Sequence, residues 1–173
     1  NIKQDIFFNG NYFSENNEFD QYLKRFGYTF KNQINELGGY TILKNKKIIL
    51  AADIGSSPTK NFSNDYQAGA LSFEIFSNDK KLISNAGYYS DKNSKFNKLS
   101  KSTALHNALT IEDYSSCNFK KNQTNLMLNR ELKVLKKNVV YENNYWKISG
   151  THDGYLINFG TSYEREIEFY PEQ

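Results

Sequence analysis

The sequence has few of the residues on which several common classes of protein depend. Its 173 residues include one cysteine, two prolines, two histidines and three arginines. The single cysteine, Cys117, excludes an internal disulfide and any metal site built from several cysteines. It has no histidine beside it to activate a thiolate, so we expect an inert thiol. No apolar run approaches the ~20 residues of a membrane-spanning helix, and residues 1–5 lack the apolar core of a secretion signal.

Positive charge is spread along the chain instead of being gathered in one place. The 22 basic and 19 acidic residues give a net charge of +3, and the lysines are mixed with acids and asparagines. Proteins that bind nucleic acid usually cluster arginine and lysine on one face with aromatic residues between them. The only arginines here are Arg25, Arg130 and Arg165. We therefore expect a solvated surface and no nucleic-acid partner.

The composition is that of one folded domain. Hydrophobic residues make up 38% of the chain and aromatic residues 16%, and a chain of this length buries roughly 70% of its unfolded surface. No repeat or linker divides it. The chain begins without methionine and ends at Gln173, so we treat it as part of a longer protein. We expect a lead-in segment with a short helix over residues 1–36, and a β-sandwich over residues 37–173.

Short segments rich in β-branched and aromatic residues alternate with polar turns. The clearest is 163–169, where tyrosine, arginine, isoleucine and phenylalanine alternate with glutamates. Long intervening helices, which a parallel sheet requires, are missing, so the pattern predicts a mainly antiparallel β-sandwich. The predicted hairpins are 40–44 with 47–53, 71–76 with 81–84, and 139–141 with 145–149.

Other segments give weaker signals. Apolar residues at helical spacing predict a helix over 17–26, and residues 126–135 fit either a helix or an alternating strand. Residues 55–65 and 88–101 are typical of loops. If 103–111 is a strand, its periodicity turns His106 away from the apolar face, which suits either a cleft or a solvated surface.

Common catalytic templates are missing from the sequence. It has no Gly-x-Ser-x-Gly elbow, no His-Glu-x-x-His motif, no phosphate-binding glycine loop and no calcium loop. His152 follows a predicted strand and precedes a turn, so we expect its side chain to bond to the nearby backbone. The tyrosines could stack on sugar rings, although most rings of this kind fill the core of a sandwich.

A series of segments, in this order, resembles heparinase II/III-like proteins. They are Leu-Gly-Gly-Tyr at 37–40, Gln-Ala-Gly-Ala-Leu-Ser-Phe-Glu at 67–74, Leu-Ile-Ser-Asn-Ala-Gly at 82–87, Ser-Thr-Ala-Leu-His-Asn at 102–107, Ser-Ser-Cys-Asn-Phe at 115–119 and Thr-His-Asp-Gly-Tyr at 151–155. The resemblance covers about residues 37–169. Within the family, these segments are most similar to those of an alphaproteobacterial branch. It implies the C-terminal β-sandwich of a bacterial polysaccharide lyase, whose N-terminal α/α toroid is absent here.

The resemblance also implies a chemistry and a set of site residues. Lyases of this family cleave uronate-containing polysaccharides by β-elimination, with a tyrosine base supplied by the toroid, so the fragment alone should be inactive. The family's His-x-His-x-Asp segment corresponds here to Asp65, Gln67 and Gly69. Some members hold zinc with ligands at the positions of Gln67, Asn85 and His106; only the histidine remains, so we expect no metal and no cofactor.

Two hypotheses follow. In the first, His106 and Gln67 are catalytic residues of a lyase, Asn85, Asn107 and Asp65 bind substrate, and the site faces the protein's own toroid. Its partner is then an acidic polysaccharide. In the second, the domain is a structural or glycan-binding sandwich with a degenerate site. Without the toroid we also expect an uncovered apolar face and a possible homodimer. A single cysteine does not distinguish periplasm from cytoplasm.

Overall fold

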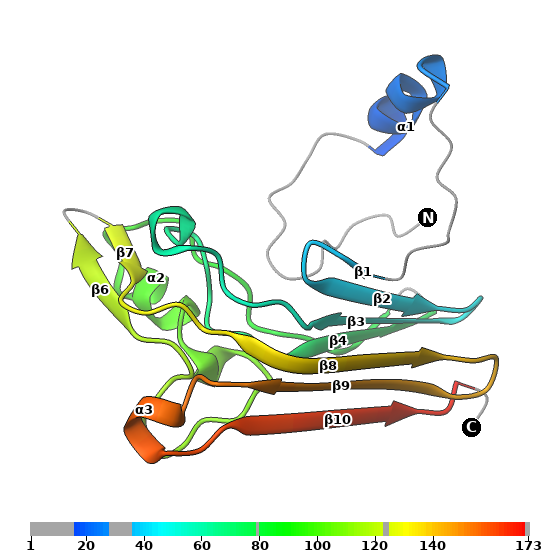
Figure 1. Ribbon diagram of the computed structural model, residues 1–173. Coiled ribbons are helices and arrows are strands. Elements are labelled where there is room, and N and C mark those ends of the chain that lie inside the picture. Colours follow the sequence, from blue (N-terminus) through cyan, green and yellow to red (C-terminus); the bar gives the residue numbers. More distant parts are fainter. Residues whose placement is uncertain (1–15, 28–35, 79, 123–124, 172–173) are drawn as a thin grey trace.

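A computed structural model describes residues 16–27, 36–78, 80–122 and 125–171 (Figure 1). Most of the predicted lead-in segment, residues 1–36, lies outside these ranges. Its short helix is present as α1 (Asn16–Arg25), which confirms the helix predicted from apolar spacing. None of the helices within the described ranges combines the length and the apolar character needed to cross a membrane.

Five antiparallel strands form the larger sheet, in the order in which they occur along the chain. Asn45 shapes the turn between the second and third strands, because its Oδ1 accepts hydrogen bonds from the N–H groups of Lys47 and Ile48 at 2.8 and 2.7 Å. This is the hairpin predicted at 40–53. The strands are β1 (Glu36–Leu37), β2 (Tyr40–Lys44), β3 (Ile48–Asp53), β4 (Phe73–Ser77) and β5 (Lys80–Ile83).

Three longer antiparallel strands form a second sheet, with β9 in the middle. In β10 the side chains alternate between half-buried and exposed, as the sequence predicted for 163–169. A separate small hairpin consists of β6 and β7. The strands are β6 (Phe119–Asn122), β7 (Asn125–Leu128), β8 (Val134–Tyr141), β9 (Trp146–His152) and β10 (Tyr163–Phe169).

The main core lies between the two large sheets, which Figure 1 shows as two layers. The larger sheet contributes Leu43, Leu50 and Ile75, and the smaller contributes Trp146 and Ile148. All five side chains are at most 6% exposed. The molecule is therefore a mainly β antiparallel sandwich, as predicted. The predicted inward face of 71–76 is also confirmed by the same core cluster, although the strand itself begins only at residue 73.

A second, smaller core closes one end of the sandwich. It contains Leu128 from β7 and Leu132 from the segment before β8, packed with Ala68, Ala70 and Cys117. Residues 126–135, whose periodicity fitted either a helix or a strand, form the end of β7, a connection and the start of β8. Leu128 and Leu132 pack into this core without a helix, whereas Leu135 is 54% exposed.

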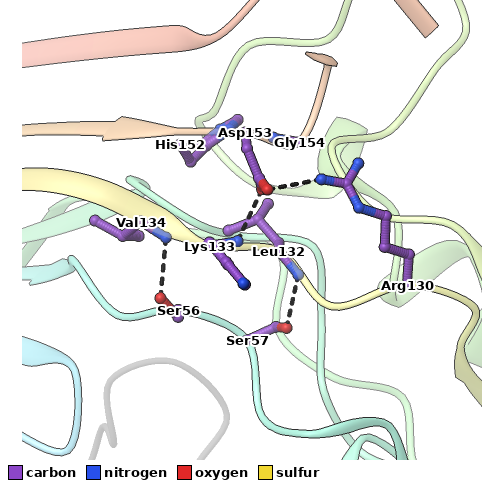
Figure 2. Close-up of polar contacts among 9 residues, drawn as sticks. All are labelled: Ser56, Ser57, Arg130, Leu132, Lys133, Val134, His152, Asp153 and Gly154. Carbon is purple, nitrogen blue, oxygen red and sulfur yellow. Dashed lines mark hydrogen bonds and ion pairs between the residues drawn. The ribbon is translucent and has the colours of Figure 1, made fainter. Parts of the chain in front are cut away.

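Polar contacts at this end hold the two sheets together (Figure 2). The hydroxyls of Ser56 and Ser57, just after β3, accept hydrogen bonds at 2.9 Å from the N–H groups of Val134 and Leu132. Asp153, just after β9, accepts a hydrogen bond from the Lys133 N–H at 2.8 Å and is paired with Arg130 at 2.7 Å. The loop that leaves the larger sheet is thereby fixed to the entry of the smaller one.

Two segments differ from what the sequence suggested. Residues 103–111 do not form a strand: the 3₁₀ turn η2 (Thr103–Leu105) is followed by turns, with a bridge between Ile111 and Tyr114. Residues 88–101 are not all loop, because they include the helix α2 (Lys95–Ser100). The other short helical elements are η1 (Lys60–Phe62), within the predicted loop 55–65, and α3 (Leu156–Phe159).

Candidate functional site

A pocket opens on the face of the larger sheet that is turned away from the main core. Tyr40 and Asp53 are directly opposite one another on β2 and β3, and Glu74 on β4 points to the same face. The alternation of a strand explains this, because their neighbours Ala52 and Ile75 point into the main core. These three side chains form the floor of the pocket.

Loops from three separate parts of the chain complete the pocket, which encloses about 460 Å³ of space, part of it open to solvent. One wall comes from the connection between η1 and β4, another from the segment that follows β5, and a third from the residue after η2. The lining residues are Tyr40, Asp53, Asp65, Tyr66, Gln67, Gly69, Ser72, Glu74, Asn85, Gly87 and His106.

Four of the five predicted site residues meet in this pocket. Asp65, Gln67, Asn85 and His106 all line it, although as many as 41 positions separate them in the sequence. Asn107 is the exception: its side chain accepts a hydrogen bond from the Phe73 N–H at 3.0 Å and donates one back to the Phe73 carbonyl. The side chain of Asn107 is therefore bonded to the backbone at the start of β4 and does not line the pocket.

His106 is held in the pocket wall by the packing of its neighbours. The hydroxyl of Thr103 in η2 donates to the Ala68 carbonyl at 2.8 Å, which places the turn against the wall loop. The imidazole then lies on Gly69, where a Cβ would be only 3.2 Å from the ring's Cγ and Nδ1. Glycine at position 69 thus leaves room for the ring.

The imidazole of His106 is neutral at ordinary pH. Burial lowers its pKa to about 4, and outweighs an opposing effect of the Ser100 backbone. The Ser100 backbone lies close enough to affect the pKa, but it is not in hydrogen-bonding geometry, so neither ring nitrogen has a hydrogen bond to the protein, and both are shielded from solvent. A buried polar atom without a partner costs free energy, which a ligand supplying a donor or acceptor would recover. His106 can therefore offer a hydrogen bond, but no positive charge.

Asn85 is engaged mainly with the protein itself. Its Oδ1 accepts a hydrogen bond from the Asn107 N–H at 3.0 Å, and its own N–H donates to Glu74 Oε1 at 2.9 Å. Its Nδ2 is 3.4 Å from the hydroxyl of Ser72, a weak contact. Asn85 thus ties the end of β5 to β4 and to the segment carrying His106, and so fixes the shape of the pocket.

Sequence reasoning missed Asp53 and the two tyrosines beside it. Burial raises the pKa of Asp53 to about 7, against a lowering effect of the Gly55 N–H, which donates to Oδ1 at 3.1 Å. Burial and then the Asp53 charge raise the pKa of Tyr40 to about 12. Burial likewise raises the pKa of Tyr66, whose hydroxyl lies near the Cys117 thiol. The signal available was an acidic residue at the end of the apolar segment 48–52.

The surroundings of the second histidine and of the cysteine indicate a structural role for both residues. His152 Nδ1 accepts a hydrogen bond from the Gly154 N–H at 3.1 Å, which confirms the predicted contact with nearby backbone. Burial lowers the pKa of His152 to about 4, so this acceptor stays unprotonated. Burial raises the pKa of the Cys117 thiol to about 12, which leaves little reactive thiolate near neutral pH.

The pocket does not suit a zinc ion of the kind bound by some heparinase II/III-like proteins. Of the corresponding residues, Gln67 and Asn85 carry amide oxygens, which are poor zinc ligands, and the Asn85 oxygen already accepts a backbone hydrogen bond. Across the described ranges, no three histidine, cysteine, aspartate or glutamate side chains gather in a way that could hold a metal. We therefore derive no chemistry through a metal.

The fold and the site define a two-sheet β-sandwich with a polar pocket on the outer face of its larger sheet. The sequence matches the model of the family "Heparinase II/III-like, C-terminal" over residues 36–173. The chain therefore belongs to the heparinase II/III-like C-terminal family. Domains of this family are related to polysaccharide lyases. A search of curated proteins finds no match.

Proposed function

We propose that the chain is the sandwich part of a lyase that cleaves uronate-containing acidic polysaccharides by β-elimination, together with an N-terminal α/α toroid. The observation that carries the proposal is the meeting of Gln67, Asn85 and His106 in one pocket of a chain that belongs to this family. The three residues come from separate loops, and the pocket lies on the face opposite the main core, where another domain can cover it.

The reaction removes the proton at C5 of the uronate, forms the C4–C5 double bond and breaks the bond from C4 to the glycosidic oxygen, which takes up a proton. Negative charge develops beside the carboxylate, so positioned hydrogen-bond donors lower the barrier. Gln67 can donate from its side-chain amide and His106 from its neutral ring, while Asn85 holds their loops in place. The base itself would come from the toroid.

The acidity of the pocket limits how an anionic substrate can lie in it. Its described lining contains three carboxyl groups, Asp53, Asp65 and Glu74, and no lysine or arginine. Asp53 is about half protonated near pH 7, because burial raises its pKa to about that value, and this weakens the repulsion. Cationic partners for the polysaccharide must therefore come from outside this lining.

The test is the ultraviolet absorbance of unsaturated uronate, measured with the full-length protein on hyaluronan, heparin, alginate and polygalacturonate. We expect absorbance with at least one substrate, and a decrease in kcat of about tenfold or more in His106→Ala. Leu105→Ala is the control for local disturbance, because Leu105 is the neighbouring residue and is 37% exposed. Equal losses in the two variants would contradict a role for the imidazole.

The second candidate is a non-catalytic sandwich that binds glycan or packs against a partner domain. It is favoured by Asp65 and Gln67 at the positions of the family's two histidines, and by a His106 that remains uncharged. The same assay separates the two functions. If the full-length protein produces no unsaturated uronate from any of the four polysaccharides, the lyase proposal fails and the non-catalytic function stands.

A further inference from the structure

The helix α2 is oriented in the opposite way to an ordinary surface helix. Its polar residues Asn97 and Ser100 are 2% and 3% exposed, while Phe96 and Leu99 are 52% and 49% exposed. Surface helices normally bury their apolar side and expose their polar side. The apolar side of α2 is therefore available for something outside the described part of the molecule.

Hydrogen bonds of the buried polar side explain the orientation. Asn97 Nδ2 donates to the Tyr89 carbonyl at 2.6 Å, and the Tyr89 N–H donates to Ser100 Oγ at 3.1 Å. Ser100 Oγ in turn donates to the Asn97 carbonyl at 2.8 Å. These bonds fix the preceding loop to the helix. They therefore fix the position of Tyr89 in the loop relative to Phe96 in the helix.

The outward side combines aromatic rings with positive charge. The rings of Tyr89 and Phe96 are 5.7 Å apart and tilted, and Lys95 Nζ is 5.5 Å from the centre of the Phe96 ring. Lys92 and Lys98 are also exposed. One acid, Asp91, is exposed nearby and accepts a hydrogen bond from the Asn93 N–H. We call this the α2 surface: Tyr89, Lys92, Lys95, Phe96, Lys98 and Leu99.

The α2 surface adjoins the pocket. Gly87 lines the pocket, and two residues later Tyr89 belongs to the surface, a distance of at most about 7 Å along the chain. Between them, the hydroxyl of Tyr88 donates to Asp65 Oδ1 in the pocket wall at 2.8 Å. A polymer longer than one sugar can therefore contact both.

We propose that the α2 surface is a second binding subsite for an acidic polysaccharide, beside the pocket. The inference rests on the proposed function for the acidic nature of the substrate. Aromatic rings provide flat apolar area for the C–H faces of sugar rings, and the lysines pair with carboxylate or sulfate groups. The subsite supplies the positive charge that the pocket lining lacks, so the polymer is held beside the pocket while one of its uronates enters it.

Binding to this chain, measured by isothermal titration calorimetry, tests the inference without any turnover. The probes are hyaluronan and heparin oligosaccharides, with a neutral cello-oligosaccharide and single-stranded oligothymidylate for comparison. We expect an acidic oligosaccharide to bind, with an affinity that falls as salt rises. The double variant Lys95→Glu/Lys98→Glu should weaken it at least tenfold, and Phe96→Ala several-fold.

The matched control is Lys46→Glu/Lys47→Glu, which changes the net charge equally. Its two exposed lysines lie in the turn between β2 and β3, at the opposite end of these strands from Tyr40 and Asp53. This control should change the affinity by less than twofold. The inference is overturned if the unmodified chain binds neither acidic probe, if the control weakens binding equally, or if oligothymidylate binds as tightly and with the same sensitivity.

Failure of this inference and failure of the proposed function can be told apart. If the full-length lyase is active and the α2 variants leave its KM for acidic polysaccharide unchanged, only the subsite is wrong. If this chain binds acidic oligosaccharides through the α2 surface and the full-length protein produces no unsaturated uronate, only the lyase is wrong.

Discussion

Asp53 and His106 lie in the same pocket, and burial moves their pKa values in opposite directions. Burial disfavours the charged form of each, which raises the pKa of the carboxyl to about 7 and lowers that of the imidazole to about 4. Near neutral pH the pocket therefore contains a partly protonated acid and a neutral histidine. Both can form hydrogen bonds, and neither provides the positive charge that an acidic sugar needs.

The raised pKa of Asp53 predicts a pH dependence of stability. The folded state holds a proton that the unfolded state, with a pKa of 3.8, has released, so the free energy of unfolding contributed by this group falls as pH rises from about 4 to about 7. In Asp53→Asn this fall should be missing, a difference of up to about 4 kcal/mol across the window. Urea denaturation of both proteins at several pH values measures it.

The comparison between the two proteins is necessary because His106 and His152 act in the other direction. Their lowered pKa values make the protein more stable as pH rises from about 4 to about 6.5. Both effects are the same in the variant and in the unmodified chain, so they cancel in the difference. Stability curves that run parallel between pH 4 and pH 7 would mean that Asp53 is not held in its protonated form.

The sequence predicted the site residues only through their resemblance to a family. Periodicity left His106 between a cleft and a solvated surface, and the strand considered for this segment is not formed, since His106 directly follows a 3₁₀ turn held by Thr103. Asp53 was not predicted, because an acid at the end of a strand is usually exposed. Its burial depends on Tyr40 and on loops far away in the sequence, which no local pattern contains.

Among the structural elements, the turn between β1 and β2 is tightly constrained by the segment that follows β3. Gly39 and Gly55 approach so closely that a Cβ on either would lie 2.8 Å from the Cα of the other. The Ile54 N–H donates to the Gly39 carbonyl at 2.8 Å, which holds the two segments together. This contact fixes the end of β3 that carries Asp53 into the pocket.

Two neighbouring glycines allow this close approach to be measured. Gly38 and Gly39 both have positive φ, 61° and 88°, so alanine is strained at either position, but only Gly39 has backbone in its way. We expect Gly39→Ala to lower the free energy of unfolding by about 1–3 kcal/mol more than Gly38→Ala. Equal losses of unfolding free energy in the two variants, measured by thermal or urea denaturation, would show that the backbone can move apart at Gly39 without a loss of stability.

The strands with strong alternation were predicted with nearly correct ends, because their pattern follows directly from burial on one face. β10 and the β2–β3 hairpin are the clearest examples. The helix α2 was hidden for the opposite reason. Its apolar residues point outward and its polar side chains inward, so its sequence has the composition of a loop.

At the scale of the whole molecule, the outer face of the larger sheet carries exposed apolar side chains among the described residues. Leu37 and Ile42, on β1 and β2, are 83% and 44% exposed. Leu37 is opposite Tyr40 in the register, so these residues share the face on which the pocket opens. Exposed apolar side chains at the edge of a sheet favour association with another surface.

This face predicts that the isolated chain forms a homodimer. Light scattering should give a mass above that of one chain at high concentration, and Leu37→Ser/Ile42→Ser should shift it toward the monomer. Leu156→Ser/Ile157→Ser is a matched control on α3, where the two side chains are 47% and 70% exposed. A strict monomer at every concentration would contradict the prediction, as would equal effects of the two pairs.

The central claim is that an acidic polysaccharide meets this domain at the pocket and the adjoining α2 surface. The most direct measurement is a titration of the ¹⁵N-labelled chain with hyaluronan and heparin oligosaccharides, followed by NMR. The account predicts that amide signals of Gln67, His106, Tyr89 and Phe96 shift with added sugar, while those of β8, β9 and β10 stay unchanged. Shifts confined to the smaller sheet, or no shifts with either sugar, would contradict it.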